Sequence, residues 1–368
     1  MRHFDANYRS TLAAAHIARK YASGLPAEAS RMNATDHVSV SAADLRARLA
    51  RLDRDAYDLE TCERYASIVE EILELKRERR AVILAHNYQR PEIFEVADFT
   101  GDSLELARRA REVEDAEVIV FCGVHFMAET AKVLNPERTV LLPDMKAGCS
   151  LADSVTAEAL AERKQELKAI YPDLRVVSYV NTTADVKALS DACCTSANAV
   201  KVVDAIDSEN ILFVPDRNLA NYVQSKTRKR IISWDGNCYV HHQINPEEIM
   251  RVRDSLPGIQ VLAHPECRRD VLALADAVLS TSAMVQYAKR SDADKFLIVT
   301  ECGLSDRLLM EVPDKRFFKT CKLCRFMKMI TLEGTLDSLR NLRHQITLDD
   351  SVREGAKRAL ERMLELSA

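Results

Sequence analysis

Three cysteines divide this chain of 368 residues into similar thirds. Cys149, Cys238 and Cys324 lie 89 and 86 residues apart, a spacing that predicts a domain-sized triplication. Three similar lobes around a pseudo-threefold axis would bring the three thiolates to one central cavity. A [4Fe–4S] cluster commonly takes four thiolates, so three would leave one iron free to bind a substrate oxygen as a Lewis acid. The spacing therefore suits a cluster with one open metal position.

Zinc is the alternative metal. A structural zinc ion takes four ligands, usually from C-x2-C pairs, and Cys321 with Cys324 forms one such pair. A zinc knuckle completed by two distant residues is therefore the competing hypothesis. Three further cysteines lie in or near apolar segments and are predicted to be small core residues: Cys122, Cys193 and Cys194.

A polar residue ends the first apolar run of each third, and a hydroxyl residue follows it at a gap of 15 or 17 residues. The polar residues are His86, Asn181 and His264, and the hydroxyl residues are Ser103, Ser196 and Thr281. The carboxyl ends of parallel strands line the ligand crevice of α/β folds. The hydroxyls fall at predicted helix N-termini, which favour anions. The pattern predicts a small polyanionic substrate.

Groups suited to proton transfer cluster near the same points of the chain. A histidine and a carboxylate are the usual acid–base pair near neutral pH, and the candidates are Tyr88, Tyr179, His86, His264 and Glu266. His241 follows Cys238 closely and is expected to support that cluster ligand. A lone histidine at a strand end is more often structural, but recurrence in corresponding places favours function. Glu301 and Cys302 end the last lobe's second strand, where either a cavity-facing or a structural role fits.

The elements that must position these groups alternate between strand and helix, which predicts parallel sheets covered by helices. We expect an α/β protein of three similar three-layer α/β/α lobes around a pseudo-threefold axis. Helices are predicted over 58–80 and after residues 102, 182, 195, 268 and 280. The expected divisions are an N-terminal extension (1–57), three lobes (58–160, 161–250 and 251–331) and a C-terminal segment of one or two surface helices (332–368).

Composition excludes several functional classes. Lys and Arg total 52 against 56 Asp and Glu, a net charge of −4, so no basic excess favours nucleic acid. No apolar run approaches the roughly 20 residues of a membrane helix, and no G-x-G-x-x-G or Walker loop suggests a nucleotide cofactor. We expect a cytoplasmic protein, with the mildly amphipathic stretch at 14–31 leaving a mitochondrial presequence as the alternative.

Several segments together closely resemble the quinolinate synthase family (type A), iron–sulfur enzymes of NAD and pyridine nucleotide biosynthesis. The matching segments run in family order from about residue 80 to 335: Ile83-Leu-Ala-His-Asn-Tyr-Gln, Gly101-Asp-Ser-Leu, Tyr179-Val-Asn, Thr195-Ser-Ala-Asn-Ala, Phe213-Val-Pro-Asp-Arg-Asn-Leu, Trp234-Asp-Gly-Asn-Cys-Tyr-Val-His, His264-Pro-Glu-Cys and Cys324-Arg-Phe-Met-Lys-Met-Ile-Thr-Leu-Glu. The resemblance implies a transferase that condenses iminoaspartate with dihydroxyacetone phosphate to quinolinate, releasing phosphate and water. It also implies an aspartate oxidase or dehydrogenase as a functional partner.

Carried over position by position, the resemblance implies Cys149, Cys238 and Cys324 as ligands of a [4Fe–4S] cluster. It implies a catalytic set in which Tyr88 and Glu266 transfer protons, with His86, His241 and His264 nearby. It further implies a substrate shell of His86, Ser103, Tyr179, Asn181, Ser196, His264, Glu266, Ser280 and Thr281.

The chain departs from the family pattern in two places. It reads Leu279-Ser280-Thr281 where members often have Gly-Ser-Thr, and it keeps only Cys321 and Cys324 where some have C-x2-C-x2-C. Two other functions compete with quinolinate synthesis: another iron–sulfur hydro-lyase on a related scaffold, and a non-catalytic iron or redox sensor. The chain has no DNA-binding motif or basic face for a sensor's output.

Overall fold

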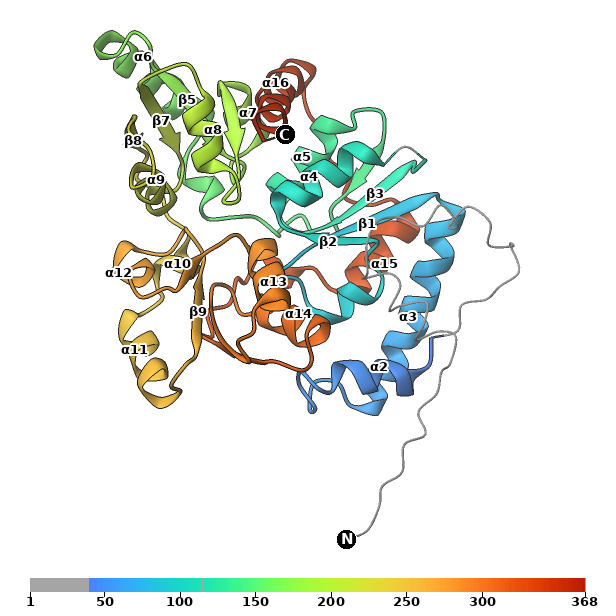
Figure 1. Ribbon diagram of the computed structural model, residues 1–368. Helices are drawn as coiled ribbons and strands as arrows, with labels where there is room; N and C mark the ends of the chain where they lie inside the picture. Colours follow the sequence, from blue (N-terminus) through green and yellow to red (C-terminus); the bar gives the residue numbers. More distant parts are fainter. Residues whose placement is uncertain (1–39, 114, 368) are drawn as a thin grey trace. The chain divides into compact units, whose positions relative to one another are not determined.

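The computed structural model describes residues 40–113 and 115–367, in which three parallel sheets of four strands each recur along the chain (Figure 1). Each sheet has the same order, with the second strand in sequence at one edge, followed by the first, third and fourth. The repeated order confirms the predicted α/β fold of three similar lobes. The stretch at 14–31 and most of the predicted extension lie outside the described residues.

The strands have the following bounds. The first sheet contains β1 (Ala81–His86), β2 (Phe99–Gly101), β3 (Val118–Cys122) and β4 (Thr139–Leu141). The second contains β5 (Arg175–Tyr179), β6 (Ala192–Cys194), β7 (Asn210–Val214) and β8 (Arg230–Ser233), and the third contains β9 (Gln260–Ala263), β10 (Ala277–Val278), β11 (Lys295–Val299) and β12 (Arg316–Lys319). In each sheet the first strand pairs in parallel with the second and third strands.

Helices cover these sheets. The first repeat contains α3 (Leu59–Glu78), α4 (Ser103–Glu112), α5 (His125–Leu134) and the 3-10 turn η2 (Pro91–Glu95), and α2 (Ala42–Leu49) packs on α3. The second repeat contains α6 (Ala157–Ile170), α7 (Ala184–Ala188), α8 (Ala199–Ala205) and α9 (Arg217–Gln224). The third contains α10 (Tyr239–His242), α11 (Pro246–Ser255), α12 (Arg269–Leu272), α13 (Thr281–Arg290) and α14 (Gly303–Glu311).

Central strands such as β3 are buried at every residue, as expected for parallel sheets covered by helices on both faces. Cys122 on β3 and Cys193 and Cys194 on the edge strand β6 are fully buried, which confirms their predicted place in the core. The chain within 40–113 and 115–367 forms no helix that is both long and apolar enough to cross a lipid bilayer.

Helix capping decides where the predicted hydroxyls lie. Asp102 caps α4 in a capping box with Glu105, and Ser280 caps α13 by accepting the Ala283 N–H, so Ser103 and Thr281 are the first residues of their helices. The predicted helix start at Thr195–Ser196 is wrong, because α8 begins only at Ala199. There the Asn198 side chain accepts the Thr195 N–H at 2.6 Å, which holds a turn ahead of the helix.

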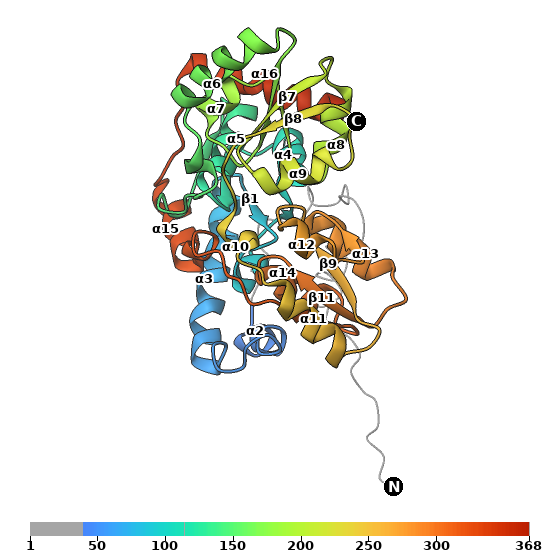
Figure 2. The same ribbon diagram turned by 90° about the vertical axis from the view of Figure 1, so that its left-hand side faces the viewer.

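The C-terminal segment contains α15 (Leu332–Asn341) and α16 (Asp350–Leu366). These helices are more than the predicted surface elements, because α15 packs on α3 and α16 packs on α7 and β6 (Figure 2). Leu360 and Met363 of α16 are fully buried. Each tail helix therefore completes the helical layer of an earlier lobe.

Candidate active site

Polar side chains from all three repeats meet where the strands end. His86 ends β1, Tyr179 ends β5 and His264 follows β9. These side chains are almost fully buried, at 5%, 4% and 3% exposure respectively. Buried polar groups are costly unless they are paired, so the partners of each side chain show what the site can do.

Three histidines and a tyrosine form a ring cluster at this point. The His86 and Tyr88 rings lie 4.7 Å apart in an edge-on arrangement, and the His241 and His264 rings stack at 4.6 Å between centroids. Tyr88 lies 6.4 Å from His241 and joins the two pairs. The structure thus brings together four of the five residues predicted to be catalytic, and the fifth is Glu266.

Glu266 is buried between two of these histidines. One of its oxygens lies 2.9 Å from His241 Nδ1 and 3.3 Å from His264 Nδ1. Burial would raise the pKa of Glu266, but attraction to His241 and hydrogen bonding with both histidines bring it below its ordinary value. Its other oxygen, Oε1, is buried without a hydrogen-bond partner. Glu266 therefore holds a negative charge with one acceptor position to spare.

Burial also sets the ionisation of the histidines. It lowers the pKa of His86 to about 3, helped by repulsion from His264 and Arg307. It lowers the pKa of His264 as well, although Glu266 opposes the change. Both side chains are therefore neutral imidazoles near pH 7, able to donate one hydrogen bond and accept another.

Thr300 joins Tyr88 to His241, and sequence reasoning missed it. Its hydroxyl lies 2.5 Å from the Tyr88 hydroxyl and 2.8 Å from His241 Nε2. Burial raises the pKa of Tyr88 well above its ordinary value, so the phenol keeps its proton. Thr300 follows β11 directly, and the same strand-end logic that selected His86 would have found it in the second apolar run of the last third.

The predicted hydroxyl residues border this cluster unevenly. Ser196 Oγ lies 3.1 Å from His264 Nε2, and Thr281 Oγ1 accepts a 2.8 Å hydrogen bond from Asn87. Ser103 lines a small, mainly apolar cavity with Val180. Ser280 donates a 2.9 Å hydrogen bond to Asp102, the cap of α4, and accepts the Ala283 N–H at the start of α13, so its hydroxyl is already committed.

Tyr179 is the last residue of β5, and Asn181 lies in the turn that follows. Burial raises the pKa of Tyr179, with a smaller contribution from the nearby charge of Glu266. Asn181 Oδ1 is buried without a hydrogen-bond partner. Lys187, which sequence reasoning also missed, is fully buried and donates to the carbonyl of Thr182 in this turn.

The three spaced cysteines occupy equivalent local settings. Each precedes a short helical turn: η3 (Ala152–Ser154) follows Cys149, α10 follows Cys238, and η4 (Met327–Met329) follows Cys324. Backbone N–H groups of these turns face each sulfur and lower its pKa. Burial outweighs them, raising the pKa of Cys149 to about 12 and those of the other two thiols as well.

The three cysteines also interact electrostatically with one another. The pKa of Cys149 is raised further by Cys324, and that of Cys238 by Cys149, so thiols from three different repeats lie within electrostatic reach. Cys238 Sγ additionally lies 3.2 Å from His241 Nδ1. Ligand atoms of Cys238, His241 and Glu266 all fall within 4.8 Å of one another. The sulfur cluster and the acid–base cluster are therefore continuous.

Asp216 is a third buried residue that sequence reasoning missed. It is fully buried after β7, and its carboxylate accepts the N–H groups of Leu219 at 2.7 Å and Cys238 at 3.0 Å. A carboxylate from its own repeat therefore holds the backbone N–H of Cys238.

Of the cysteines outside the spaced set, Cys321 is exposed and Cys302 is half-buried.

Comparison with known proteins gives consistent matches over most of the chain. The family profile described as quinolinate synthetase A protein matches residues 70–365. A quinolinate synthase of Xylella fastidiosa is 52% identical over 299 residues, covering 81% of this chain and 87% of that protein. Quinolinate synthases of Dehalococcoides mccartyi (53% over 302 residues; 82% and 98% covered) and Agrobacterium fabrum (49% over 337 residues; 91% and 95% covered) are similarly related.

Proposed function

Because this chain belongs to the quinolinate synthetase A family, we propose that it condenses iminoaspartate with dihydroxyacetone phosphate to quinolinate, releasing phosphate and water. The observation that carries this proposal is the contact of Cys238 with His241 and Glu266, all within 4.8 Å. It puts a soft metal ligand beside a carboxylate with a free oxygen. Condensation followed by loss of water is assisted by an electrophilic metal and a proton acceptor at one place.

Cys149, Cys238 and Cys324 fit as ligands of a [4Fe–4S] cluster. They come from three repeats, and each sulfur faces backbone N–H groups, which stabilise thiolate charge and tune such clusters. Three thiolates on one zinc ion would lie about 3.8 Å apart, given tetrahedral Zn–S bonds, and within the described residues these sulfurs form no group that close. When bound, the cluster supplies an open iron that polarises a substrate hydroxyl or carbonyl oxygen.

The substrate shell would hold two carboxylates and a phosphate. Ser103 and Thr281 open α4 and α13, whose dipoles favour anions, although the Asp102 and Ser280 side chains already accept first-turn N–H groups of these helices. The Ser196 hydroxyl can accept a hydrogen bond from His264 Nε2 or donate one to it, and when the ring nitrogen donates, the hydroxyl proton is left to donate to an anion. Ser280 would act through the N-terminus of α13, since its hydroxyl is committed to Asp102. Asn181 Oδ1 would accept from the imine or hydroxyl of substrate.

Proton transfer would divide between Glu266 and Tyr88. The lowered pKa of Glu266 keeps it a carboxylate near pH 7, and its unpartnered Oε1 can accept a proton from substrate. The raised pKa of Tyr88 keeps its phenol protonated and able to donate. His86 and His264 would orient substrate as neutral imidazoles, while His241 holds Glu266 and borders Cys238.

The reaction also needs a source of iminoaspartate. Oxidation of the amine of aspartate forms this imine, so an aspartate oxidase or dehydrogenase must supply it. We propose the cytoplasm as the place where the two activities meet.

The test is an anaerobic assay on the purified chain. Iron, sulfide and the visible spectrum are recorded, and quinolinate is then measured after addition of iminoaspartate and dihydroxyacetone phosphate. We expect about four irons per chain and product formation. Cys149→Ala, Cys238→Ala and Cys324→Ala should lose both, while Cys302→Ala and Cys321→Ala keep the iron.

Two outcomes would contradict the proposal. A full iron–sulfur load without quinolinate would indicate another hydro-lyase or a sensor. Tightly bound zinc in place of iron, surviving each of the three substitutions, would remove the cluster assignment and leave the triplication as architecture alone.

A further inference from the structure

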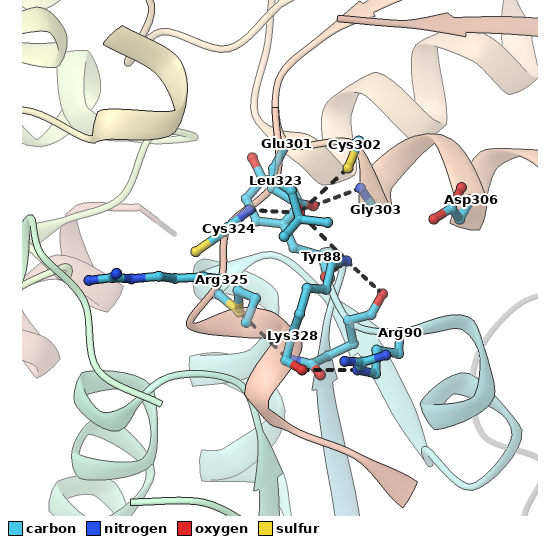
Figure 3. Close-up of polar contacts among 12 residues, drawn as sticks. Tyr88, Arg90, Glu301, Cys302, Gly303, Asp306, Leu323, Cys324, Arg325 and Lys328 are labelled. Carbon is cyan, nitrogen blue, oxygen red and sulfur yellow. Dashed lines mark hydrogen bonds and ion pairs between the residues drawn. The ribbon is translucent and has the colours of Figure 1, made fainter. Parts of the chain in front are cut away.

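Glu301 is a fully buried carboxylate whose two oxygens both accept backbone N–H groups. It follows Thr300 beyond the end of β11, and none of its surface is exposed. Oε1 accepts the N–H of Cys324 at 3.1 Å, and Oε2 accepts that of Gly303 at 2.7 Å (Figure 3). Cys324 lies in an irregular segment between β12 and η4. The Glu301 carboxylate therefore anchors the Cys324 backbone where no helix or strand does so.

Lys328 joins this carboxylate to the segment that carries Tyr88. Its Nζ lies 3.5 Å from Glu301 Oε1 and donates to the carbonyl oxygens of Tyr88 at 2.5 Å and Gln89 at 3.4 Å. In the opposite direction, the Arg90 side chain donates a 2.9 Å hydrogen bond to the backbone carbonyl of Lys328 (Figure 3). Two reciprocal side-chain contacts thus connect residues that are about 240 positions apart in the chain.

Gly303 shows how closely these groups are packed. A Cβ atom at this position would lie 2.4 Å from Lys328 Nζ, 2.8 Å from Glu301 Oε2 and 2.9 Å from the Tyr88 carbonyl oxygen. Only glycine leaves room for the ammonium, the carboxylate and the carbonyl to meet. The three contacts therefore depend on one another and on a residue without a side chain.

The same device occurs in the preceding repeat. Asp216 follows β7 as Glu301 follows β11, and it accepts the N–H of Cys238. The carboxylate precedes its cysteine by 22 residues in one repeat and by 23 in the other. A chance contact would not be expected to recur at the same place in two lobes whose sequences differ.

We infer that Glu301 and Lys328 are positioning residues that fix the backbone of Cys324 against the backbone of Tyr88. They touch neither substrate nor the reacting atoms. Instead they fix the position of a sulfur from the third repeat relative to a phenol from the first. The inference deepens the proposed function and rests on it for the roles of the sulfur and the phenol. Small displacements of such groups are costly, since a shift of about 1 Å can reduce a rate roughly a hundredfold.

Hydrogen exchange of the full-length chain, purified without oxygen, tests the structural half without any substrate. In Glu301→Gln an amide N–H2 replaces one acceptor oxygen and faces a backbone N–H. We expect exchange at Cys324 or Gly303 to rise about tenfold or more, as for loss of a charge-assisted hydrogen bond. Asp306→Asn, which removes the more exposed ion pair of Asp306 with Lys319 (3.1 Å), should leave both amides as protected as in the unmodified chain.

A kinetic cycle tests the functional half. Glu301→Gln and Lys328→Met should each lower kcat about tenfold while KM stays within about twofold, because neither side chain binds substrate. The double variant should be no slower than the slower single variant, since the two residues act as one unit. Asp306→Asn with Lys319→Met is the matched cycle and should leave kcat unchanged.

The outcomes separate this inference from the proposed reaction. Unchanged exchange at both amides in Glu301→Gln, or kcat losses that multiply in the double variant, would overturn the positioning role. If Glu301→Gln does not fold, the Lys328→Met kinetics and its iron-release rate to a chelator, expected to rise, decide the question. Failure of the unmodified chain to make quinolinate, with the exchange result as expected, would overturn the reaction and leave the structural coupling in place.

Discussion

Glu266 and Glu301 are both buried carboxylates beyond strand ends of the same sheet, yet their surroundings are opposite. Glu266 contacts two histidines through one oxygen and leaves the other unpartnered. Glu301 accepts a backbone N–H on each oxygen and lies beside an ammonium. Their pKa values move in opposite directions: burial raises that of Glu301 despite Lys328, whereas the histidines bring that of Glu266 below its ordinary value.

The difference teaches how to separate chemical from positioning groups in a buried site. A carboxylate whose two oxygens both accept backbone N–H groups, with an ammonium beside it, can hold a structure but has little capacity left for substrate. One with a free oxygen is costly to bury in the folded state and is best explained by a partner that arrives with substrate. The predictions below test this contrast.

The largest effect is expected from Glu266→Gln. Loss of a general base typically lowers rates by about 10²- to 10⁴-fold, and we expect kcat to fall in this range while iron content and Cys324 amide protection are retained. The control is Glu92→Gln, since Glu92 is equally buried but only accepts a 2.7 Å hydrogen bond from Tyr57. A loss of less than about tenfold in Glu266→Gln would erase the proposed distinction between the two carboxylates.

Gly303→Ala should break the Glu301 side of the comparison. The added Cβ would come within 3.0 Å of three polar atoms, and overpacking of this kind costs about 1–3 kcal/mol. We expect urea unfolding to show a loss in this range. Gly148→Ala is the control, because its Cβ would meet nothing nearer than 3.9 Å. Equal losses of unfolding free energy in the two variants would show that the contacts around Lys328 leave room for a Cβ at position 303.

The Glu266 side can be sharpened through pH. Burial lowers the pKa of His86 from 6.5 to about 3, so between these values the unfolded chain binds a proton that the folded chain does not. The free energy of unfolding is therefore unaffected by His86 above pH 6.5. It falls as the pH is lowered, because only the unfolded chain gains the proton, and at pH 5 the loss is roughly 2 kcal/mol. His86→Gln should lose correspondingly less stability between pH 7 and pH 5 in urea unfolding.

The control for the pH experiment is Thr335→Val, which removes a fully buried hydroxyl but no ionisable group. It should be destabilised by a similar amount at both pH values. If His86→Gln and the unmodified chain lose the same free energy between pH 7 and pH 5, His86 is not held as a neutral imidazole by burial.

Much of this fold could be predicted from the sequence, because apolar runs and polar strand ends reflect burial directly. His86 and His264 lie at strand ends as expected, and Cys122 and Cys193 lie in the core. The error at Ser196 arose because a local side-chain contact from Asn198 delays the helix, which hydrophobic periodicity cannot show.

The residues that were missed share one physical reason. Thr300, Asp216 and Lys187 act through contacts with residues far apart in the chain or with backbone groups, and neither kind of contact leaves a local pattern. Two of the three, Asp216 and Thr300, lie just beyond the third strand of their repeats. Treating those strand ends like the first ones would have selected both.

Thr300→Val tests the point where the two regions meet, because Thr300 precedes Glu301 in sequence and contacts the histidine that holds Glu266. The substitution keeps the shape of the side chain but removes the hydroxyl shared by Tyr88 and His241. Leaving such groups unsatisfied costs about 1–3 kcal/mol, and we expect kcat to fall about tenfold with Cys324 amide protection unchanged. Thr335→Val, whose hydroxyl donates to the carbonyl of Thr331 at the start of α15 and lies 3.7 Å from Cys122 Sγ, should match the loss of stability without the loss of kcat. If both variants keep full activity, Tyr88 is oriented by its Lys328-bound backbone alone, and the Glu301 region would then account for the placement of the phenol without help from Thr300.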